Sequence, residues 1–242
     1  MKPVSSVTQS ALDAGHWPTG TLLQMLAPTS RAALLGLGTE RSYENGDTVL
    51  REQDYSTHVV LLYNAVVKIT GSLENGRTAF LGIKVSGDLV GEMAALSGEP
   101  RCATVTICGD AIVRVIKQQS FLRYLREFPD AHLALDRMIM AQLLWANKRR
   151  IDFNGYPAFV RLARVLVELA NGYGRRTAMG ISFDVGLTQR ELGALVGAEA
   201  DTARKELRKL RERGVIHAGY RTITIVDKAK LEAIAYGWSQ TG

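Results

Sequence analysis

Cysteine is scarce in this 242-residue sequence, which contains only Cys102 and Cys108. Two thiols cannot build a disulfide scaffold, and they are too few for a four-thiolate zinc site or an iron–sulfur cluster. The four histidines show no paired spacing suited to the axial ligands of a haem. We therefore expect two reduced cysteines in a cytoplasmic protein, with no metal site.

Long apolar runs are also missing. The most apolar stretch, residues 138–146, includes Gln142 and is far shorter than the roughly 20 residues needed to span a bilayer. The first 20 residues do not show the cationic and then apolar order of a secretory signal. These absences predict a soluble, intracellular protein with no membrane partner.

Common catalytic motifs are absent as well. The sequence has no Walker A phosphate loop, no G-x-S-x-G nucleophile elbow and no zinc-binding His-Glu-x-x-His. Gly36-Leu37-Gly38 follows a predicted helix rather than a strand, which makes it a poor dinucleotide-binding loop. The sequence therefore predicts a protein that is not an enzyme.

Acidic residues are outnumbered by basic ones. The chain has 30 Lys and Arg against 24 Asp and Glu, a net charge of +6 and an isoelectric point near 9.4. This excess favours nucleic acid or an anionic small molecule as a partner. A hydrophobic content of 46% fills ordinary cores, and the length is comfortable for two domains.

The pattern of residues changes twice in the first half of the chain. Residues 1–20 show no periodicity and are predicted to form a flexible arm. In residues 21–128, helical spacing broken at Pro28 is followed by short β-branched runs between Gly-Asp and Asn-Gly turns. Asn75-Gly76 is the best hairpin signal, because both central residues of a type I′ turn need positive φ. Residues 21–128 are therefore predicted to form an antiparallel sandwich or roll.

Residues 129–155 carry the longest helical pattern. A stripe on this helix has the near-heptad spacing of a coiled-coil seam, and with its neighbouring glutamine it comprises Leu135, Ile139, Gln142, Leu143 and Ala146. We predict that these residues form a dimer interface. An amphipathic helix packed only on its own domain is the alternative.

Residues 156–242 contain the signal of a helix-turn-helix. Thr188 and Glu191 have capping-box spacing, so a helix should begin at Thr188, and Gly197 should end it in a tight turn. The next helix, residues 201–213, has one apolar face and one cationic face, which suits the major groove of DNA. Two short strands follow as a wing. The exposed helix face and the wing supply Thr202, Lys205, Arg208 and Arg221.

A second constellation suits an anion. Gly91 allows close approach of the backbone to a ligand, and the segment that follows, with Met93 and Ala94, can aim N–H groups at it. Glu92 is an acceptor suited to a ribose hydroxyl, and Arg101 offers a planar donor fork for a phosphate. The alternative is a surface salt bridge between Glu92 and Arg101.

These two constellations, in this order and joined by one long helix, resemble the family of the cyclic AMP receptor protein and its fumarate–nitrate regulator relatives. The resemblance covers about residues 22–235 and includes the glycine–aspartate turns as well as both constellations. It implies an α+β fold with an N-terminal cyclic-nucleotide-binding antiparallel β-roll, a long dimerisation helix and a C-terminal winged helix-turn-helix. The implied partners are a second copy of the chain, two-fold symmetric double-stranded DNA and RNA polymerase.

The resemblance also assigns effector contacts. Gly91 and Glu92 match the family's backbone and ribose contacts, and Arg101 matches its phosphate contact. The next residue in the family usually bears a hydroxyl, whereas this chain has Cys102, a weaker donor. The backbone N–H groups of Cys102 and Ala103 are still available to the phosphate.

The base-contacting half of the pocket departs from the family. The hydroxyl pair that contacts adenine is replaced by Ala146-Asn147, and the amide of Asn147 offers a different base contact. Ala65 stands where the family usually has a turn glycine. Cyclic AMP is the expected effector, and cyclic GMP, another small effector or no ligand at all are open alternatives.

The DNA-contacting residues depart from the family too. The family's guanine-contacting arginine matches Ala200, its acidic neighbour matches Asp201, and a later arginine matches Lys205, with Arg204 beside it. Losing an arginine–guanine contact removes roughly 1–3 kcal/mol of discrimination at that base. The resemblance places the residues at the start of the preceding helix on phosphates, namely Thr188, Gln189 and Arg190.

Two alternatives to a nucleotide-controlled regulator follow from these departures. One is a regulator of the same family that senses another effector or is constitutively active. The other is a cyclic-nucleotide-binding regulatory subunit of a partner enzyme, against which the cationic helix at residues 201–213 argues.

Overall fold

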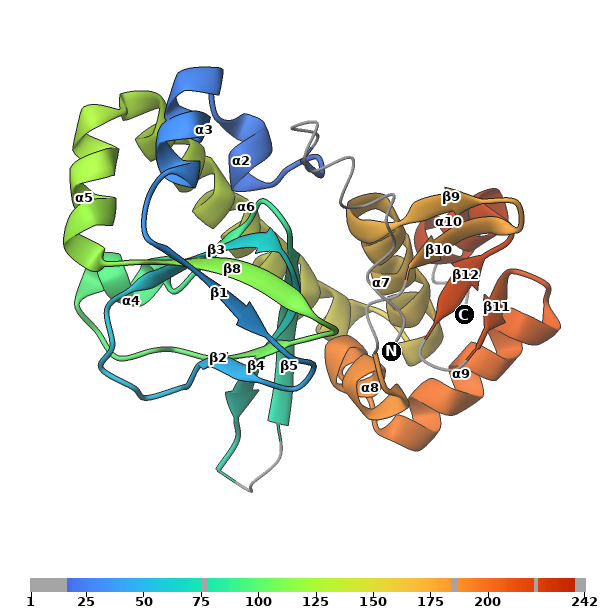
Figure 1. The fold of residues 1–242 in the computed structure, drawn as a ribbon. Helices are drawn as coiled ribbons and strands as arrows, with labels where there is room; N and C mark the ends of the chain where they lie inside the picture. Colours follow the sequence, from blue (N-terminus) through green and yellow to red (C-terminus); the bar gives the residue numbers. More distant parts are fainter. Residues whose placement is uncertain (1–16, 75–77, 184–186, 220–221, 238–242) are drawn as a thin grey trace. The chain divides into compact units, whose positions relative to one another are not determined.

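A computed structural model describes residues 17–74, 78–183, 187–219 and 222–237 of the chain. It divides into two compact units, Met1–Leu143 and Leu144–Gly242 (Figure 1). The long helix that carries the chain from the first unit into the second is continuous across this boundary.

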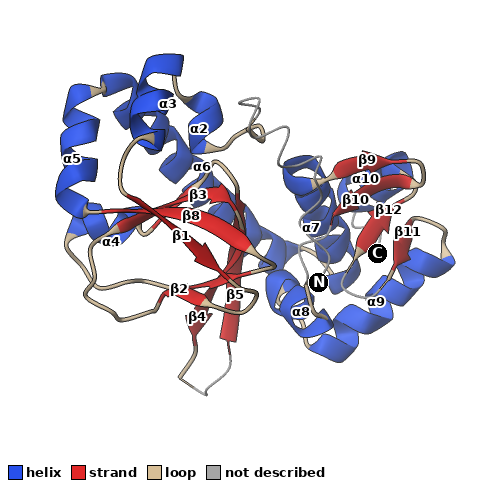
Figure 2. Ribbon diagram, in the orientation of Figure 1, coloured by secondary structure: helices blue, strands red, loops and turns tan. Residues whose placement is uncertain are grey.

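The first unit is built on two four-stranded sheets, ordered β1-β8-β3-β6 and β2-β7-β4-β5 (Figure 2). Every strand pairing in them is antiparallel, which confirms the predicted antiparallel roll. The strands are β1 (Thr39–Tyr43), β2 (Thr48–Leu50), β3 (Val59–Asn64), β4 (Val66–Ser72), β5 (Thr78–Val85), β6 (Leu89–Val90), β7 (Thr104–Ile107) and β8 (Ala111–Ile116). The predicted Asn75-Gly76 turn lies outside the described residues, between β4 and β5.

Strand β3 separates the two hydrophobic cores of this unit. Its side chains alternate between the faces of the sheet, as the two-residue period of a strand requires. Val59 and Leu61 pack in a core under the helices, whereas Val60 and Leu62 pack in a core that includes residues of both sheets. All four are fully buried, so this run is apolar at every position instead of alternating with polar residues.

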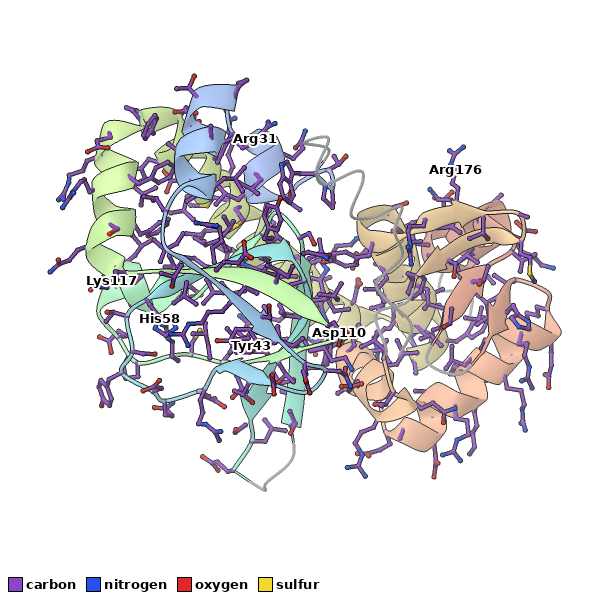
Figure 3. All side chains as sticks on the ribbon, in the orientation of Figure 1. Arg31, Tyr43, His58, Asp110, Lys117 and Arg176 are labelled. Carbon is purple, nitrogen blue, oxygen red and sulfur yellow. The ribbon has the colours of Figure 1, made fainter. Side chains whose placement is uncertain are left out.

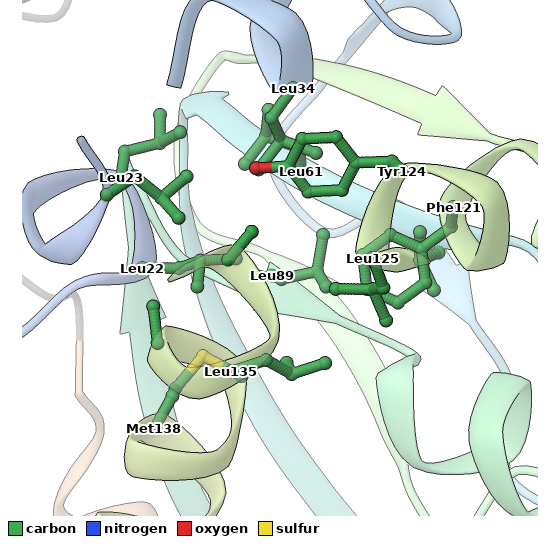
Figure 4. Packing of buried hydrophobic residues seen from close by; sticks show 14 of the residues in the cluster. Leu22, Leu23, Leu34, Leu61, Leu89, Phe121, Tyr124, Leu125, Leu135 and Met138 are labelled. Atoms are coloured by element: carbon green, nitrogen blue, oxygen red, sulfur yellow. The ribbon is translucent and has the colours of Figure 1, made fainter. Parts of the chain in front are cut away.

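Helices cover the outer face of the β3 sheet. The helices among the described residues of this unit are α2 (Leu22–Met25), α3 (Pro28–Leu35), α4 (Glu92–Ser97), α5 (Gln118–Glu127) and the first part of α6 (Pro129–Gly155). Figure 4 shows leucines of α2 and α3 meeting Phe121 and Tyr124 of α5 and Leu135 and Met138 of α6. Pro28 occupies the first turn of α3, where its missing N–H costs nothing, so the predicted helix break is found there.

The arm predicted for residues 1–20 is wrong at its C-terminal end. Trp17 is 8% exposed and packs in the helical core, where its ring lies edge-on to Tyr63 at 5.8 Å. The large apolar surface of an indole favours this burial over a loose tail. Residues 1–16 lie outside the described part of the chain.

The second unit combines helices with one antiparallel sheet of order β11-β12-β10-β9. After the last turns of α6 its elements are α7 (Ala158–Tyr173), β9 (Arg175–Thr177), β10 (Gly180–Phe183), α8 (Gln189–Val196), α9 (Ala200–Glu212), β11 (Ile216–Ala218), β12 (Ile223–Ile225) and α10 (Lys228–Tyr236). Helix α7 forms the centre, with eight buried apolar side chains, and α10 packs beside it.

Hydrogen bonds and ion pairs between side chains connect the end of α6 to α7. The indole of Trp145 donates to Glu168 at 2.9 Å, and Lys148 pairs with the same carboxylate. One turn further on, Asp152 accepts from Arg164 at 2.6 Å. These contacts join the last turns of α6 to the second unit.

Candidate functional site

The predicted anion-binding segment, residues 91–103, is called the cassette below. It begins at a glycine with a left-handed backbone. Gly91 has φ +84° and immediately precedes α4. A Cβ at this position would lie 2.6 Å from Nη1 of Arg101 and 2.9 Å from Leu50. Both the backbone conformation and the close approach of Arg101 therefore require glycine here.

Arg101 is held inside the cassette by its own chain. It is 2% exposed, and its Nε donates to Oγ of Ser56 at 3.2 Å. Nη1 donates to the Gly91 carbonyl at 2.8 Å and Nη2 to the His58 carbonyl at 2.5 Å. Burial lowers the pKa of the guanidinium. A guanidinium carries five N–H groups, so three of them are used within the described residues.

Glu92 does not pair with Arg101, so the surface salt-bridge alternative is wrong. Glu92 is 3% exposed, and its carboxylate lies 3.3 Å from Nζ of Lys84, which also donates to the Leu89 carbonyl at 2.7 Å. Sequence reasoning missed Lys84, although a lysine in an otherwise apolar strand signals a buried charge partner. The pair is well compensated in an interior where a lone carboxylate is costly.

A second carboxylate is buried beside this pair. Asp88 accepts from the backbone N–H of Val85 at 3.2 Å. Burial is the main cause that raises its pKa to about 6, and Glu92 acts in the same direction while Lys84 opposes it. Glu92, Asp88 and Lys84 thus form a buried group of two acids and one base, in addition to the buried guanidinium of Arg101.

Two sulfur atoms lie at the surface of the cassette. Cys102 is exposed, and its Sγ is 3.9 Å from Sδ of Met93, whose side chain is 51% exposed. Ala94 and Ala103 are buried. The predicted effector residues from 91 to 103 are therefore together in one place, but with sulfur at their exposed edge.

His58 was not predicted to belong to the cassette. It precedes β3, and its side chain is labelled in Figure 3. Burial lowers the pKa of its imidazole, and the positive charge of Arg101 lowers it further. Both effects favour the neutral form of the imidazole. Asn147 is exposed on α6 in the second unit, so its base contact stays a prediction.

The helix-turn-helix is formed by α8 and α9. The Thr188 Oγ1 accepts from the Glu191 N–H at 3.2 Å, and the Glu191 carboxylate accepts from the Thr188 N–H at 2.7 Å. Both bonds of the predicted capping box are present. Gly197 ends α8 with φ +64°, as its predicted place in the turn requires.

Helix α9 presents a cationic face. Ala203, Leu207 and Leu210 are buried. The predicted DNA-contacting side chains on the opposite face are exposed, namely Asp201, Arg204, Lys205 and Arg208, while Ala200 and Thr202 are half-buried.

Contacts link the two helices at their exposed ends. Nε of Arg204 donates to the side-chain oxygen of Gln189 at 2.8 Å, and Nη1 of Arg204 lies 3.2 Å from Asp201. Thr188, Gln189 and Arg190 are all exposed at the start of α8. An arginine held by these neighbours is oriented before any base or phosphate arrives.

The wing consists of β11 and β12. Ile216 and Ile225 are paired and buried, whereas His217 is exposed. Arg221, the predicted phosphate contact of the wing, lies outside the described residues. At the other edge of the sheet, Figure 3 shows Arg176 extending outward from β9.

The predicted dimer stripe on α6 is wrong in part. Leu135 is 1% exposed and packs in the core of its own unit, with Ile139 partly buried against that core. The reason is that Ala131, Ala134, Leu135 and Met138 share the inward helix face at three- and four-residue spacing.

The predicted residues nearer the C-terminus differ from Leu135. Leu143 and Ala146 are exposed, and Gln142 is half-buried. Several further apolar side chains of α6 are also exposed, namely Leu133 (50%), Met140 (57%), Leu144 (69%) and Ile151 (66%). Their spacing of seven, four and seven residues places the seam on a different face from Leu135.

Two absences hold for the residues described here. None of the helices has the length and apolar character to cross a membrane. No group of three or more His, Cys, Asp or Glu residues is arranged to hold a metal ion.

Comparisons with known proteins place these elements in a family. A cyclic nucleotide-binding domain matches residues 40–128, and a Crp-like helix-turn-helix domain matches residues 160–234. The "CRP-like cAMP-activated global transcriptional regulator" of Mycobacterium tuberculosis is 25% identical over 212 residues, which cover 87% of this chain and 94% of that protein.

Solved structures agree on the fold. FixK2 from Bradyrhizobium japonicum has a TM-score of 0.73 at 20% identity, covering 84% of this chain and all of that one. The "c-di-GMP Responsive Global Regulator CLP" of Xanthomonas campestris has a TM-score of 0.69 at 21% identity, covering 82% and 99%.

The chain belongs to the family of the cyclic AMP receptor protein and the fumarate–nitrate regulator. It is a DNA-binding transcription regulator with a cyclic-nucleotide-binding domain. The relatives it matches are transcriptional regulators.

Proposed function

We propose that this protein is a homodimeric transcription regulator whose DNA binding is controlled by a cyclic nucleotide held in the Gly91–Ala103 cassette. The observation that carries the proposal is the buried guanidinium of Arg101, fixed against the left-handed Gly91. A fixed, desolvated cation is suited to a single phosphate charge.

The cassette has donors left for a phosphate. Two of the five guanidinium N–H groups of Arg101 are not used by Ser56, Gly91 or His58. The backbone N–H groups of Cys102 and Ala103 add to them. Glu92, oriented by Lys84, accepts a ribose hydroxyl. The family resemblance makes Asn147 the predicted contact to the base edge.

Cyclic AMP is the first effector to test, since the Mycobacterium tuberculosis relative is named as cAMP-activated. Cyclic GMP is the second. The experiment is isothermal calorimetry on the purified protein, with Arg101→Gln as the matched variant. Heat with one nucleotide that Arg101→Gln abolishes supports the proposal. Absence of heat and of thermal stabilisation with both nucleotides would contradict it.

Self-association is proposed along the exposed seam of α6. Leu133, Met140, Leu144 and Ile151 expose apolar surface that water disfavours, and Leu143 and Ala146 are exposed on the same helix. A two-fold dimer buries the same patch on both subunits. Light scattering coupled to gel filtration tests the dimer directly.

DNA recognition is proposed through α9 in the major groove. Lys205, Arg208 and Arg204 face outward, and Ala200 replaces the expected guanine-contacting arginine. The predicted phosphate contacts are Thr188, Gln189, Arg190 and Arg221. Selection from random duplexes should return two-fold symmetric sites with half-sites one helical turn apart. Asymmetric or single half-sites would contradict the proposal. RNA polymerase is the proposed protein partner at the promoter.

A different effector is the second candidate. Cys102 and Met93 place sulfur at the edge where a hydroxyl is expected, and the CLP structure belongs to a regulator described as c-di-GMP responsive. A panel of nucleotides, including cyclic di-GMP, in the same calorimetric experiment separates this candidate from the first.

A further inference from the structure

One arginine joins the end of α6 to the turn of the helix-turn-helix. Arg161 lies in the first turn of α7, between the two helix ends that it contacts. Its Nη1 donates to the carbonyls of Phe153 at 3.1 Å and Tyr156 at 3.0 Å. Its Nη2 donates to the carbonyl of Gly197 at 3.1 Å.

The need for this arginine begins with a proline. The carbonyl of Phe153 would ordinarily accept from the N–H four residues later, but that residue is Pro157, which has none. Arg161 supplies the missing donor. Its positive charge also lies at the C-terminal end of α6, where the helix dipole favours a cation.

The same guanidinium serves the end of a second helix. Gly197 is the left-handed residue that terminates α8, and its carbonyl begins the turn leading to α9. The α-carbon side of Gly197 packs on the ring of Phe153, since an added Cβ would lie 3.1 Å from two ring carbons. Arg161 also stands over this ring, with Cζ 5.7 Å from its centre.

We infer that Arg161 is a positioning residue for DNA recognition, which fixes the orientation of α8 and α9 relative to the end of α6. This inference rests on the proposed dimeric DNA binding, because two recognition helices must match half-sites at a fixed separation. The three hydrogen bonds of Arg161 to Phe153, Tyr156 and Gly197 are called the joint below. Weakening the joint leaves the phosphate-contacting charges in place but lets the recognition helices vary in orientation.

The test compares specific with non-specific DNA affinity. Arg161→Lys keeps the charge but lacks the planar fork that reaches three carbonyls. We expect its affinity for a duplex selected by the natural protein to fall about tenfold, the effect of losing a charge-assisted hydrogen bond. Affinity for a mixed-sequence duplex should change less than twofold, with the same salt dependence.

A second variant changes the glycine whose carbonyl accepts from Arg161. Gly197→Ala adds a Cβ against the Phe153 ring at a residue whose φ disfavours side chains, so the same selective loss is expected. The matched control is Leu231→Val, which removes a methylene from a fully buried residue of α10. It should lower thermal stability while leaving the ratio of specific to non-specific affinity unchanged.

Hydrogen exchange without DNA separates this inference from the proposed function. Arg161→Lys should speed amide exchange in α8 and the turn at residues 197–199, whereas Leu231→Val should speed it around α10. If the natural protein selects no site, the proposed function fails and exchange alone decides the role of Arg161. An unchanged affinity ratio in Arg161→Lys, a ratio that falls equally in Leu231→Val, or unchanged exchange in α8 overturns the inference.

Discussion

At the scale of single residues, two buried acids beside the effector cassette share one lysine. Lys84 compensates Glu92 directly, and Asp88 is buried beside them. With both acids ionised, Lys84 neutralises only one of the two negative charges, because the guanidinium of Arg101 is bonded to Ser56, Gly91 and His58 instead. A protein interior opposes such a charge, which is why burial raises the pKa of Asp88 to about 6.

The sign of the pH effect follows from this shift. Because the pKa of Asp88 is raised from 3.8 to about 6 in the folded protein, its contribution favours folding at low pH. That contribution is lost as pH rises through about 4 to 6. The ionised carboxylate then costs about 1–3 kcal/mol, discounting for its coupling to Lys84.

Asp88→Asn removes this titration and retains an acceptor for the Val85 N–H. We expect the variant and the natural protein to have similar stability at pH 4.5, and the variant to be more stable at pH 7.5. Urea unfolding of the first unit at both pH values measures the difference. A difference that is the same at both values would show that Asp88 does not titrate in this range.

Cys102 offers a second prediction at this scale. Cys102→Ser restores a hydroxyl, a better donor to phosphate oxygens than a thiol. We expect cyclic nucleotide affinity to rise about fivefold, equivalent to roughly 1 kcal/mol for one hydrogen bond. Calorimetry measures it, with Cys108→Ser as control because Cys108 lies outside the cassette. Weaker binding in Cys102→Ser would point instead to an effector that prefers the thiol.

At the scale of elements, α8 depends on its cap. Thr188 and Glu191 exchange the two bonds of a capping box, and Thr188→Ala removes the side-chain half of it. We expect a loss of about 0.5–2 kcal/mol in the stability of the second unit. Urea unfolding measures the loss, and Thr188→Ser should preserve most of the stability. Equal losses in both variants would argue that the methyl group of Thr188, not its hydroxyl, matters.

Helix α6 provides the other element-scale prediction. Leu144 is 69% exposed at the middle of the seam. Leu144→Glu places a charge there in both subunits and should weaken the dimer by about 3 kcal/mol or more, roughly a hundredfold in its dissociation constant.

Sedimentation velocity over a concentration series detects the weakened dimer. Met179→Glu is the matched control, because Met179 is 61% exposed at the turn between β9 and β10 and is not part of α6. A Leu144→Glu protein that stays dimeric at the concentrations where the natural protein does would place the interface elsewhere.

At the scale of the whole molecule, local patterns predicted the elements well. The β-branched runs at β2, β3, β4 and β7, the helix over residues 129–155 and the capping box all depend on residues close in sequence. Helices α5 and α10 were not predicted, because helices of ten and nine residues give few repeats of a helical period, and their apolar faces acquire meaning only when packed on α6 and α7.

The site was harder to predict for the same physical reason. Gly91, Glu92 and Arg101 are identifiable by residue type, but the partners of Arg101 are mostly backbone carbonyls, which any residue supplies. Leu135 was placed on the dimer seam because heptad spacing does not say which helix face meets the chain's own core. Contacts between distant segments decide both questions.

Strand β3 has a consequence for handling the protein. Val59-Val60-Leu61-Leu62 is an uncharged run with high β-propensity, and it is hidden only because a core lies on each side of it. When the first unit opens on heating, this run becomes free to pair with the same run of other molecules. Heat inactivation should therefore end in aggregates, and the apparent melting temperature should rise with scan rate and fall with protein concentration.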